Sequence, residues 1–109
     1  MIYHIATKVA WIKAQQEGQY TAPSLSSEGF IHCSTIQQVL PVANLLFHGQ
    51  KDIVLLHIDE KKLSAPLKYD PVSEKQGERF PHIYGAINLD AVLEVSDFRE
   101  DERGGYRLP

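Results

Sequence analysis

The chain has 109 residues, the usual size of one folding domain, so we predict a single domain. Hydrophobic residues make up 43% of it and charged residues 23%, a composition that predicts a packed core and excludes a disordered chain. The net charge of −3 is the opposite of the basic surface that nucleic-acid-binding domains carry, so we expect no nucleic-acid partner.

The charged side chains are divided unevenly along the chain. Residues 1–50 carry only four of them, although three of the five histidines lie in that half. Histidines in such a segment are either buried in their neutral form or kept for a functional site. The histidines of the first half therefore become candidate site residues.

The single cysteine, Cys33, excludes an intramolecular disulfide and suits a reducing compartment. No apolar run approaches the length of a membrane span, and the first residues do not form a signal peptide. We therefore expect a soluble cytoplasmic protein that makes no membrane contact.

The first part of the chain predicts a strand, a helix and a loop. The apolar segment Ile2–Ala6 predicts a short buried strand. Thr7 can cap a helix over Lys8–Glu17, and Gly18 can end it. Residues 18–28 are rich in turn formers and show no sustained period, which predicts a surface loop.

A strand-to-helix junction follows. Phe30–Cys33 predicts a four-residue strand, and Ser34 with Gln37 three residues later forms the pattern of a capping box. The helix should cover about residues 35–48. Pro41 lies inside that range, so we expect either a kink or a helix that begins later.

The second half predicts mainly strands. Ile53–Asp59 is almost continuously apolar, which is typical of a central strand with both faces covered. Leu67–Tyr69 predicts a short strand, and residues 70–79 predict a polar loop. The proline and glycine of Phe80–Gly85 argue against a plain strand there, and Ala91–Val95 predicts the core of the last strand.

Two histidines lie in predicted strands, and each has two interpretations. His4 is either a core histidine bonded to a backbone carbonyl or a site residue. His32 comes just before the predicted helix N-terminus at Ser34 and Thr35, where free N–H groups favour an anion. An imidazole and a hydroxyl there suit a ribose or a phosphate; otherwise Ser34 only caps the helix and His32 packs.

His82 and Tyr84 lie in the segment Phe80–Gly85, whose proline and glycine fix the backbone path. An imidazole and a phenol held in this way can form the wall of a ligand site, because the aromatic ring stacks while the polar ends bond. Arg79, just before them, can bind a phosphate. The other interpretation is that Phe80 and Tyr84 fill the core while His82 faces solvent.

Three of the histidines, His4, His32 and His82, could together bind a catalytic zinc ion. No two of them are close in sequence, so their spacing gives this idea no support. We predict a site without a metal, and we interpret His48 as a helix cap and His57 as a structural hydrogen-bonding residue.

Six segments taken together resemble a small bacterial family catalogued as domain of unknown function 952. In chain order they are Ile2–His4, Gly29–Thr35, Val42–Asn44, Phe47–Gly49, Leu55–Asp59 and Phe80–Gly85. The resemblance covers about residues 2–98, and the two histidine segments are its most specific parts. The family looks like a member of the ADP-ribosyltransferase-like superfamily, whose fold is a split β-sheet with a few helices and a cleft that holds NAD.

The resemblance implies a single α+β domain over residues 1–98, with a split, mostly antiparallel sheet and two main helices. Residues 99–109 have dense mixed charge and paired glycines, which predicts a solvated, flexible tail.

The resemblance also implies roles for particular residues. His4 would contact the ribose or nicotinamide of NAD, and His32 would clamp the nicotinamide ribose together with Ser34 and Thr35. The acid that the family has in this region corresponds to Asp70.

The RNA 2′-phosphotransferases, a branch of the superfamily with a similar histidine-rich pattern, imply that His4 and His32 hold the NAD ribose. Arg79 or His82 would then position the acceptor. No arginine precedes Arg79 in this chain, which argues against a large RNA substrate.

We therefore expect NAD or a related nucleotide to bind in a histidine-lined cleft, with transfer of ADP-ribose to a small acceptor as the candidate activity. The predicted catalytic residues are His4, His32, His82 and Asp70. The predicted cofactor-binding residues are His4, His32, Ser34, Thr35, Arg79 and Tyr84. The alternatives are a non-catalytic nucleotide-binding or interaction module and a zinc-dependent hydrolase that uses the same histidines.

Overall fold

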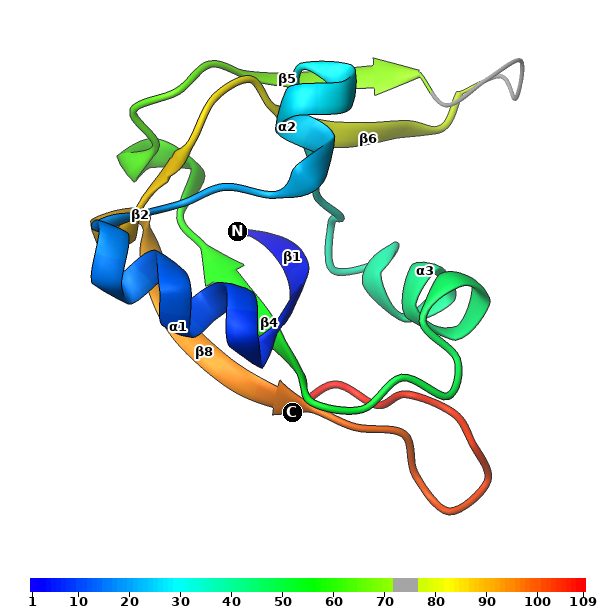
Figure 1. Cartoon of the computed structure of the whole chain (residues 1–109). Helices are drawn as coiled ribbons and strands as arrows, with labels where there is room; N and C mark the ends of the chain where they lie inside the picture. Colours follow the sequence, from blue (N-terminus) through cyan, green and yellow to red (C-terminus); the bar gives the residue numbers. More distant parts are fainter. Residues whose placement is uncertain (72–76) are drawn as a thin grey trace.

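The computed structural model describes residues 1–71 and 77–109, which form three antiparallel sheets and three α-helices (Figure 1). The first sheet has the order β1-β4-β8, with strands Ile2–Thr7, Ile53–Ile58 and Val92–Phe98. The second pairs β2 (Gln19–Tyr20) with β7 (Ile87–Asn88), and the third has the order β3-β6-β5, with strands Ile31–His32, Arg79–Ile83 and Leu67–Pro71. The helices are α1 (Lys8–Glu17), α2 (Pro23–Glu28) and α3 (Val39–Leu46), and two short 3₁₀ turns cover Glu60–Lys62 and Leu89–Ala91.

This architecture confirms the predicted single α+β domain with a split antiparallel sheet and two main helices, α1 and α3. The predicted polar loop at residues 70–79 lies in large part outside the described residues, since residues 72–76 are not among them. None of the helices in the described part of the chain is long and apolar enough to cross a membrane.

Strand β4 is the centre of the first sheet, as its apolar sequence predicts, and it separates two hydrophobic clusters. Val54 and Leu56 point to the cluster that includes Ala14 of α1, while Leu55 points to the cluster on the other face that includes Ala43 of α3. Successive residues of a strand face opposite sides, so one strand serves both clusters. Figure 1 shows α1 and α3 on opposite sides of β4.

Helix α1 begins and ends where the sequence predicts. The Thr7 hydroxyl accepts a hydrogen bond from the Ala10 N–H at 3.0 Å. Gly18 adopts the left-handed conformation with φ 85°, and its N–H donates to the Ala14 carbonyl at 2.8 Å. The two caps satisfy backbone groups at both ends of the helix.

The loop predicted for residues 18–28 is wrong, because this segment contains β2 and helix α2. Pro23 occupies the first position of α2, where its missing N–H costs nothing, and Gly29 ends the helix with φ 90°. A six-residue helix is too short to show a hydrophobic period, so the turn-forming residues dominated the pattern. The next strand is also shorter than predicted, and β3 covers only Ile31–His32.

Helix α3 begins at Val39, so a helix start at residue 35 is wrong and the later start is confirmed. Pro41 lies in the first turn, where its ring meets no earlier helical carbonyl. The capping pattern is shifted by one residue: the Gln38 side-chain carbonyl accepts from the Thr35 N–H at 3.0 Å. Ser34 instead pairs with Tyr3 of β1 through two backbone hydrogen bonds of 2.8 Å.

The segment Phe80–Gly85 contains most of β6, the central strand of the third sheet, so the argument against a plain strand is wrong. Proline is rare in a central strand because it cannot donate to the ladder. The Pro81 carbonyl accepts from the Cys33 N–H at 3.0 Å, and β3 has already ended at His32. The missing Pro81 N–H therefore costs β3 no ladder bond.

The C-terminal segment is anchored by Tyr106, which is only 4% exposed. Its ring packs on Phe98 of β8 with a centroid separation of 4.7 Å. Its hydroxyl donates to the Phe47 carbonyl at 2.7 Å, just after α3. One aromatic side chain thus completes the core cluster on the α3 side of the first sheet.

We expect Tyr106→Ala to lower the free energy of unfolding by about 3 kcal/mol, because it leaves a cavity beside Phe98. Tyr106→Phe should cost about 1 kcal/mol, the contribution of one hydrogen bond. Urea unfolding followed by circular dichroism measures both values, with Leu108→Ala, at a 40% exposed position, as the control. Equal unfolding midpoints for Tyr106→Ala and the wild type would contradict this role.

Candidate functional site

The third sheet has one apolar face and one polar face. Ile31, Ile83 and Leu67 lie opposite one another on the three strands and pack into the core cluster on the α1 side. The next residues on the three strands point the other way. They form the polar face of the sheet.

The polar face carries a row of three basic residues across the strands. The strand register pairs His32 of β3 with His82 of β6, and His82 with Lys68 of β5. Residues directly opposite each other in an antiparallel sheet share a face, with neighbouring strands about 4.8 Å apart. We call this surface the histidine face. Its members are His32, Lys68, Asp70, His82 and Tyr84, together with Phe30.

One carboxylate oxygen of Asp70 accepts hydrogen bonds from both His82 and Tyr84. Asp70 Oδ2 lies 2.8 Å from His82 Nδ1 and also accepts a hydrogen bond from the Tyr84 hydroxyl. Both hydrogen bonds lower the pKa of Asp70, and the bond from Tyr84 has the larger effect. The bond between Tyr84 and Asp70 also raises the pKa of Tyr84. At neutral pH Asp70 is ionised and Tyr84 is protonated.

An ionised Asp70 also determines which nitrogen of the His82 ring carries the proton. The carboxylate can only accept, so Nδ1 of His82 carries the proton and Nε2 of the neutral ring offers a lone pair. Nε2 bonds no residue in the described part of the chain, and His82 is 7% exposed. This is the arrangement of a general base oriented by a carboxylate.

Phe30 packs against the other rings of the histidine face. It stacks on His82 with a centroid separation of 4.0 Å and an interplanar angle of 19°. Its centroid lies 4.9 Å from that of His32 and 5.4 Å from that of Tyr84. Lys68 Nζ lies 5.1 Å from the Tyr84 ring centroid, within cation–π distance.

His4 lies elsewhere, in the core. It is 8% exposed, its Nδ1 lies 2.6 Å from the His32 carbonyl oxygen, and its Nε2 lies 2.8 Å from the Tyr20 hydroxyl. Burial lowers the pKa of His4 to about 4 and raises that of Tyr20, so the ring is neutral and the phenol keeps its proton. Nδ1 therefore donates to the carbonyl, and Nε2 accepts from Tyr20.

Three other predicted site residues do not join the histidine face. Thr35 and Arg79 line a cavity of about 390 Å³ between α3 and β6, and strand alternation points Arg79 away from His82. Ser34 is 5% exposed, and its backbone is bonded to Tyr3. Of the predicted set, the structure brings together His32, Asp70, His82 and Tyr84.

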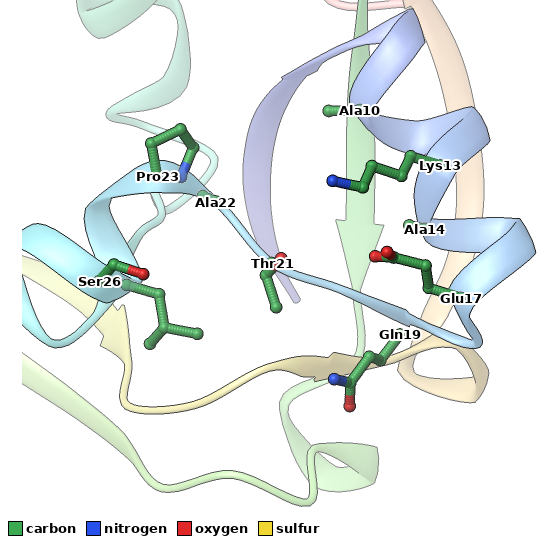
Figure 2. A pocket seen from close by; sticks show the side chains of 10 residues that line it. Ala10, Lys13, Ala14, Glu17, Gln19, Thr21, Ala22, Pro23 and Ser26 are labelled. Carbon is green, nitrogen blue, oxygen red and sulfur yellow. The ribbon is translucent and has the colours of Figure 1, made fainter.

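A second cavity, of about 410 Å³, lies between α1 and α2 (Figure 2). Figure 2 shows Lys13 and Glu17 extending from α1 toward it, with Thr21 and Ser26 across from them. Neither of the two cavities is lined by a histidine. The clustered histidines therefore lie on a sheet face instead of inside either cavity.

The described residues contain no group of three or more His, Cys, Asp or Glu side chains arranged to hold a metal ion. The three histidines considered for zinc do not converge. Both ring nitrogens of His4 are already bonded, whereas His32 and His82 face the other side of the sheet.

The sequence did not single out Lys68, Glu28 or Phe30 as site residues. Lys68 reaches the site only through the pairing of β5 with β6. Glu28 Oε2 lies 3.1 Å from His32 Nε2 because Gly29 turns the chain between α2 and β3. The alternation of Phe30 with His32 was the one local signal that could have identified Phe30.

Comparisons with known proteins support the fold over almost the whole chain. The family described as protein of unknown function (DUF952) matches residues 5–95. The X-ray structure of protein CC0527 from Caulobacter crescentus is similar at 30% sequence identity, with a TM-score of 0.86 over 98% of this chain and 93% of that chain. The solution NMR structure of CC0527 gives a TM-score of 0.84 at 30% identity, over 98% of this chain and 91% of that chain. No curated protein matches the chain.

The buried His4 makes stability depend on pH. Its pKa is about 4 in the folded state, against an ordinary value of 6.5, so the unfolded state binds the proton first. Stability should be full above pH 6.5 and fall by about 3 kcal/mol as the pH drops to 4. Urea unfolding between pH 4 and 7 measures this loss.

The variant His4→Gln removes the titrating group while it keeps an amide for hydrogen bonding. We expect its stability to change less over this pH range than that of the wild type. The matched control is His48→Gln, at a side chain that is 67% exposed. An unchanged pH dependence in His4→Gln would show that another group controls acid unfolding.

Proposed function

The chain belongs to the DUF952 family, and from that premise we propose that it binds NAD or a related nucleotide on the histidine face and transfers ADP-ribose to a small acceptor. The assignment to the ADP-ribosyltransferase-like superfamily is part of this proposal and rests on the resemblance of the two histidine segments. The observation that carries the proposal is the convergence of His82, Asp70 and Tyr84 beside Lys68.

The chemistry of the histidine face suits a nucleotide. The rings of Phe30 and Tyr84 can stack on a base or on a nicotinamide ring. The Lys68 ammonium offsets phosphate charge, and the imidazole of His32 can bond ribose hydroxyls.

Bound NAD would supply an ADP-ribosyl group, with nicotinamide as a leaving group that departs as a neutral molecule. His82 Nε2 takes the proton from the acceptor hydroxyl as the acceptor oxygen bonds to the ribose carbon. Asp70 stabilises the imidazolium that forms, and Tyr84 keeps Asp70 oriented through its hydrogen bond. Phe30 holds the plane of the His82 ring by stacking on it.

A second candidate function is a non-catalytic nucleotide-binding or interaction module. The observation that favours it is the packing of Phe30 on His82 at 4.0 Å, which covers one face of the ring and leaves His82 only 7% exposed. A surface closed in this way can bind a ligand through Lys68 and the outer ring faces without proton transfer.

Binding is tested by calorimetric titration of NAD. We expect Lys68→Ala and His82→Ala to weaken binding about tenfold, or about 1.4 kcal/mol each. Lys13→Ala removes the same charge from the cavity between α1 and α2 and is the matched control. If only Lys13→Ala weakens binding, the nucleotide occupies that cavity and the histidine face is the wrong site.

Transfer is tested by following nicotinamide release with small hydroxyl and phosphate acceptors. Asp70→Asn should slow release about 100-fold and change NAD affinity little, because the amide keeps the shape but not the charge that stabilises the His82 imidazolium. Binding of NAD without release for any acceptor would support the non-catalytic module. The absence of NAD binding would refute the transferase and leave only an interaction module that does not bind NAD.

A further inference from the structure

A second imidazole–carboxylate pair lies beside the first. His32 Nε2 is 3.1 Å from Glu28 Oε2, and His82 Nδ1 is 2.8 Å from Asp70 Oδ2. The two imidazole rings meet edge to face, with centroids 5.2 Å apart and an interplanar angle of 81°. The site therefore holds two neighbouring imidazoles, each oriented by its own carboxylate.

In the transfer reaction proposed above, the pair of His32 and Glu28 transfers no proton. Nicotinamide leaves NAD as a neutral molecule and needs no proton, so one base is enough. A reaction that needs both a base and an acid uses the arrangement more fully. Cleavage of a phosphate ester at a sugar oxygen is such a reaction, because the leaving oxygen must gain a proton as the attacking water loses one.

The surroundings of the two histidines suit one of them to act as the acid and the other as the base. Asp70 binds Nδ1 of His82 and leaves Nε2, whereas Glu28 binds Nε2 of His32 and leaves Nδ1. The His32 side chain is 54% exposed and the Glu28 side chain 49%, so water reaches both groups. The His82 side chain is 9% exposed and is held by an ionised carboxylate, which suits a base.

The rest of the histidine face suits a nucleoside phosphate. Lys68 stands next to His82 in the same cross-strand row, so its ammonium lies on the side of the base away from His32. There it can offset the charge of a phosphate that lies over the row formed by His32, His82 and Lys68. The rings of Phe30 and Tyr84 border the same row and can stack on a base.

We propose that the histidine face hydrolyses a nucleoside 2′,3′-cyclic phosphate, with His82 as the general base and His32 as the general acid. A single cyclic nucleotide is favoured over a long RNA because the chain has a net charge of −3 and no basic tract to bind many phosphates. The activity shares the site of the proposed nucleotide binding but does not depend on NAD.

The proposed step balances with water as the only co-reactant. The water oxygen bonds to phosphorus while His82 Nε2 takes a water proton. The bond from phosphorus to one ribose oxygen breaks, and that oxygen takes the proton from His32 Nδ1. The product is a nucleoside monophosphate, and proton exchange with solvent restores the two histidines.

The experiment uses the full chain with adenosine 2′,3′-cyclic phosphate, and chromatography follows the monophosphate product from pH 4.5 to 8.5. We expect a bell-shaped profile of kcat/KM, and we expect His32→Gln and His82→Gln each to lower kcat about 100-fold. Glu28→Gln should lower kcat about tenfold and leave KM unchanged, because the Glu28 carboxylate orients the His32 ring. A purely structural role for Glu28 would lower the thermal unfolding midpoint and leave kcat of the folded protein unchanged.

The matched control is His57→Gln, which changes a histidine of the first sheet that bonds Ser96 and should leave the rate unchanged. Circular dichroism and thermal unfolding of every variant separate loss of the fold from loss of activity. No hydrolysis above the protein-free rate, or equal rates for the wild type and His32→Gln, would overturn the inference.

The same preparations are titrated with NAD, so the two proposals fail separately. NAD binding with nicotinamide release but no hydrolysis of the cyclic phosphate overturns this inference and leaves the proposed function standing. Hydrolysis without NAD binding supports this inference and refutes the proposed function.

Discussion

One buried histidine joins all three sheets. His4 of β1 donates from Nδ1 to the carbonyl of His32 in β3 and accepts at Nε2 from the hydroxyl of Tyr20 in β2. The neutral ring satisfies both partners with its proton on Nδ1, because a carbonyl can only accept. A charged ring would lose its hydration in this apolar surrounding, and burial accordingly lowers the pKa of His4. The contact among the three sheets is thus built around a neutral imidazole.

The hydrogen bond from His4 holds the backbone of His32 and leaves its side chain free of the core. Its carbonyl is held in the core by His4, and its side chain points to the opposite face of the sheet beside His82. The backbone pairing of Tyr3 with Ser34 continues the contact between the first and third sheets. The histidine face is therefore built on strands that the core holds rigidly, which is what an oriented imidazole–carboxylate pair needs.

The elements that could be predicted are those with local causes. The Thr7 and Gly18 caps define α1 through bonds within a few residues, and the apolar sequence of Ile53–Ile58 is enough to make β4 central. Helix α2 and strand β6 were missed because their turn formers and proline are compatible with several structures. Only packing decides among them: β6 tolerates Pro81 because β3 has ended at His32.

For the candidate site, the sequence by itself placed His32 in a strand, which β3 confirms, and selected His82 and Tyr84 as candidate site residues without identifying strand β6. The pairing of the strands decided the rest. Strand register brought Lys68 and Asp70 to His82 and turned Arg79 to the other face, and core packing enclosed His4. Register is set by contacts between segments far apart in the chain, and a shift of one residue would exchange the two faces of a strand. For that reason the site could be seen only once the sheets were assembled.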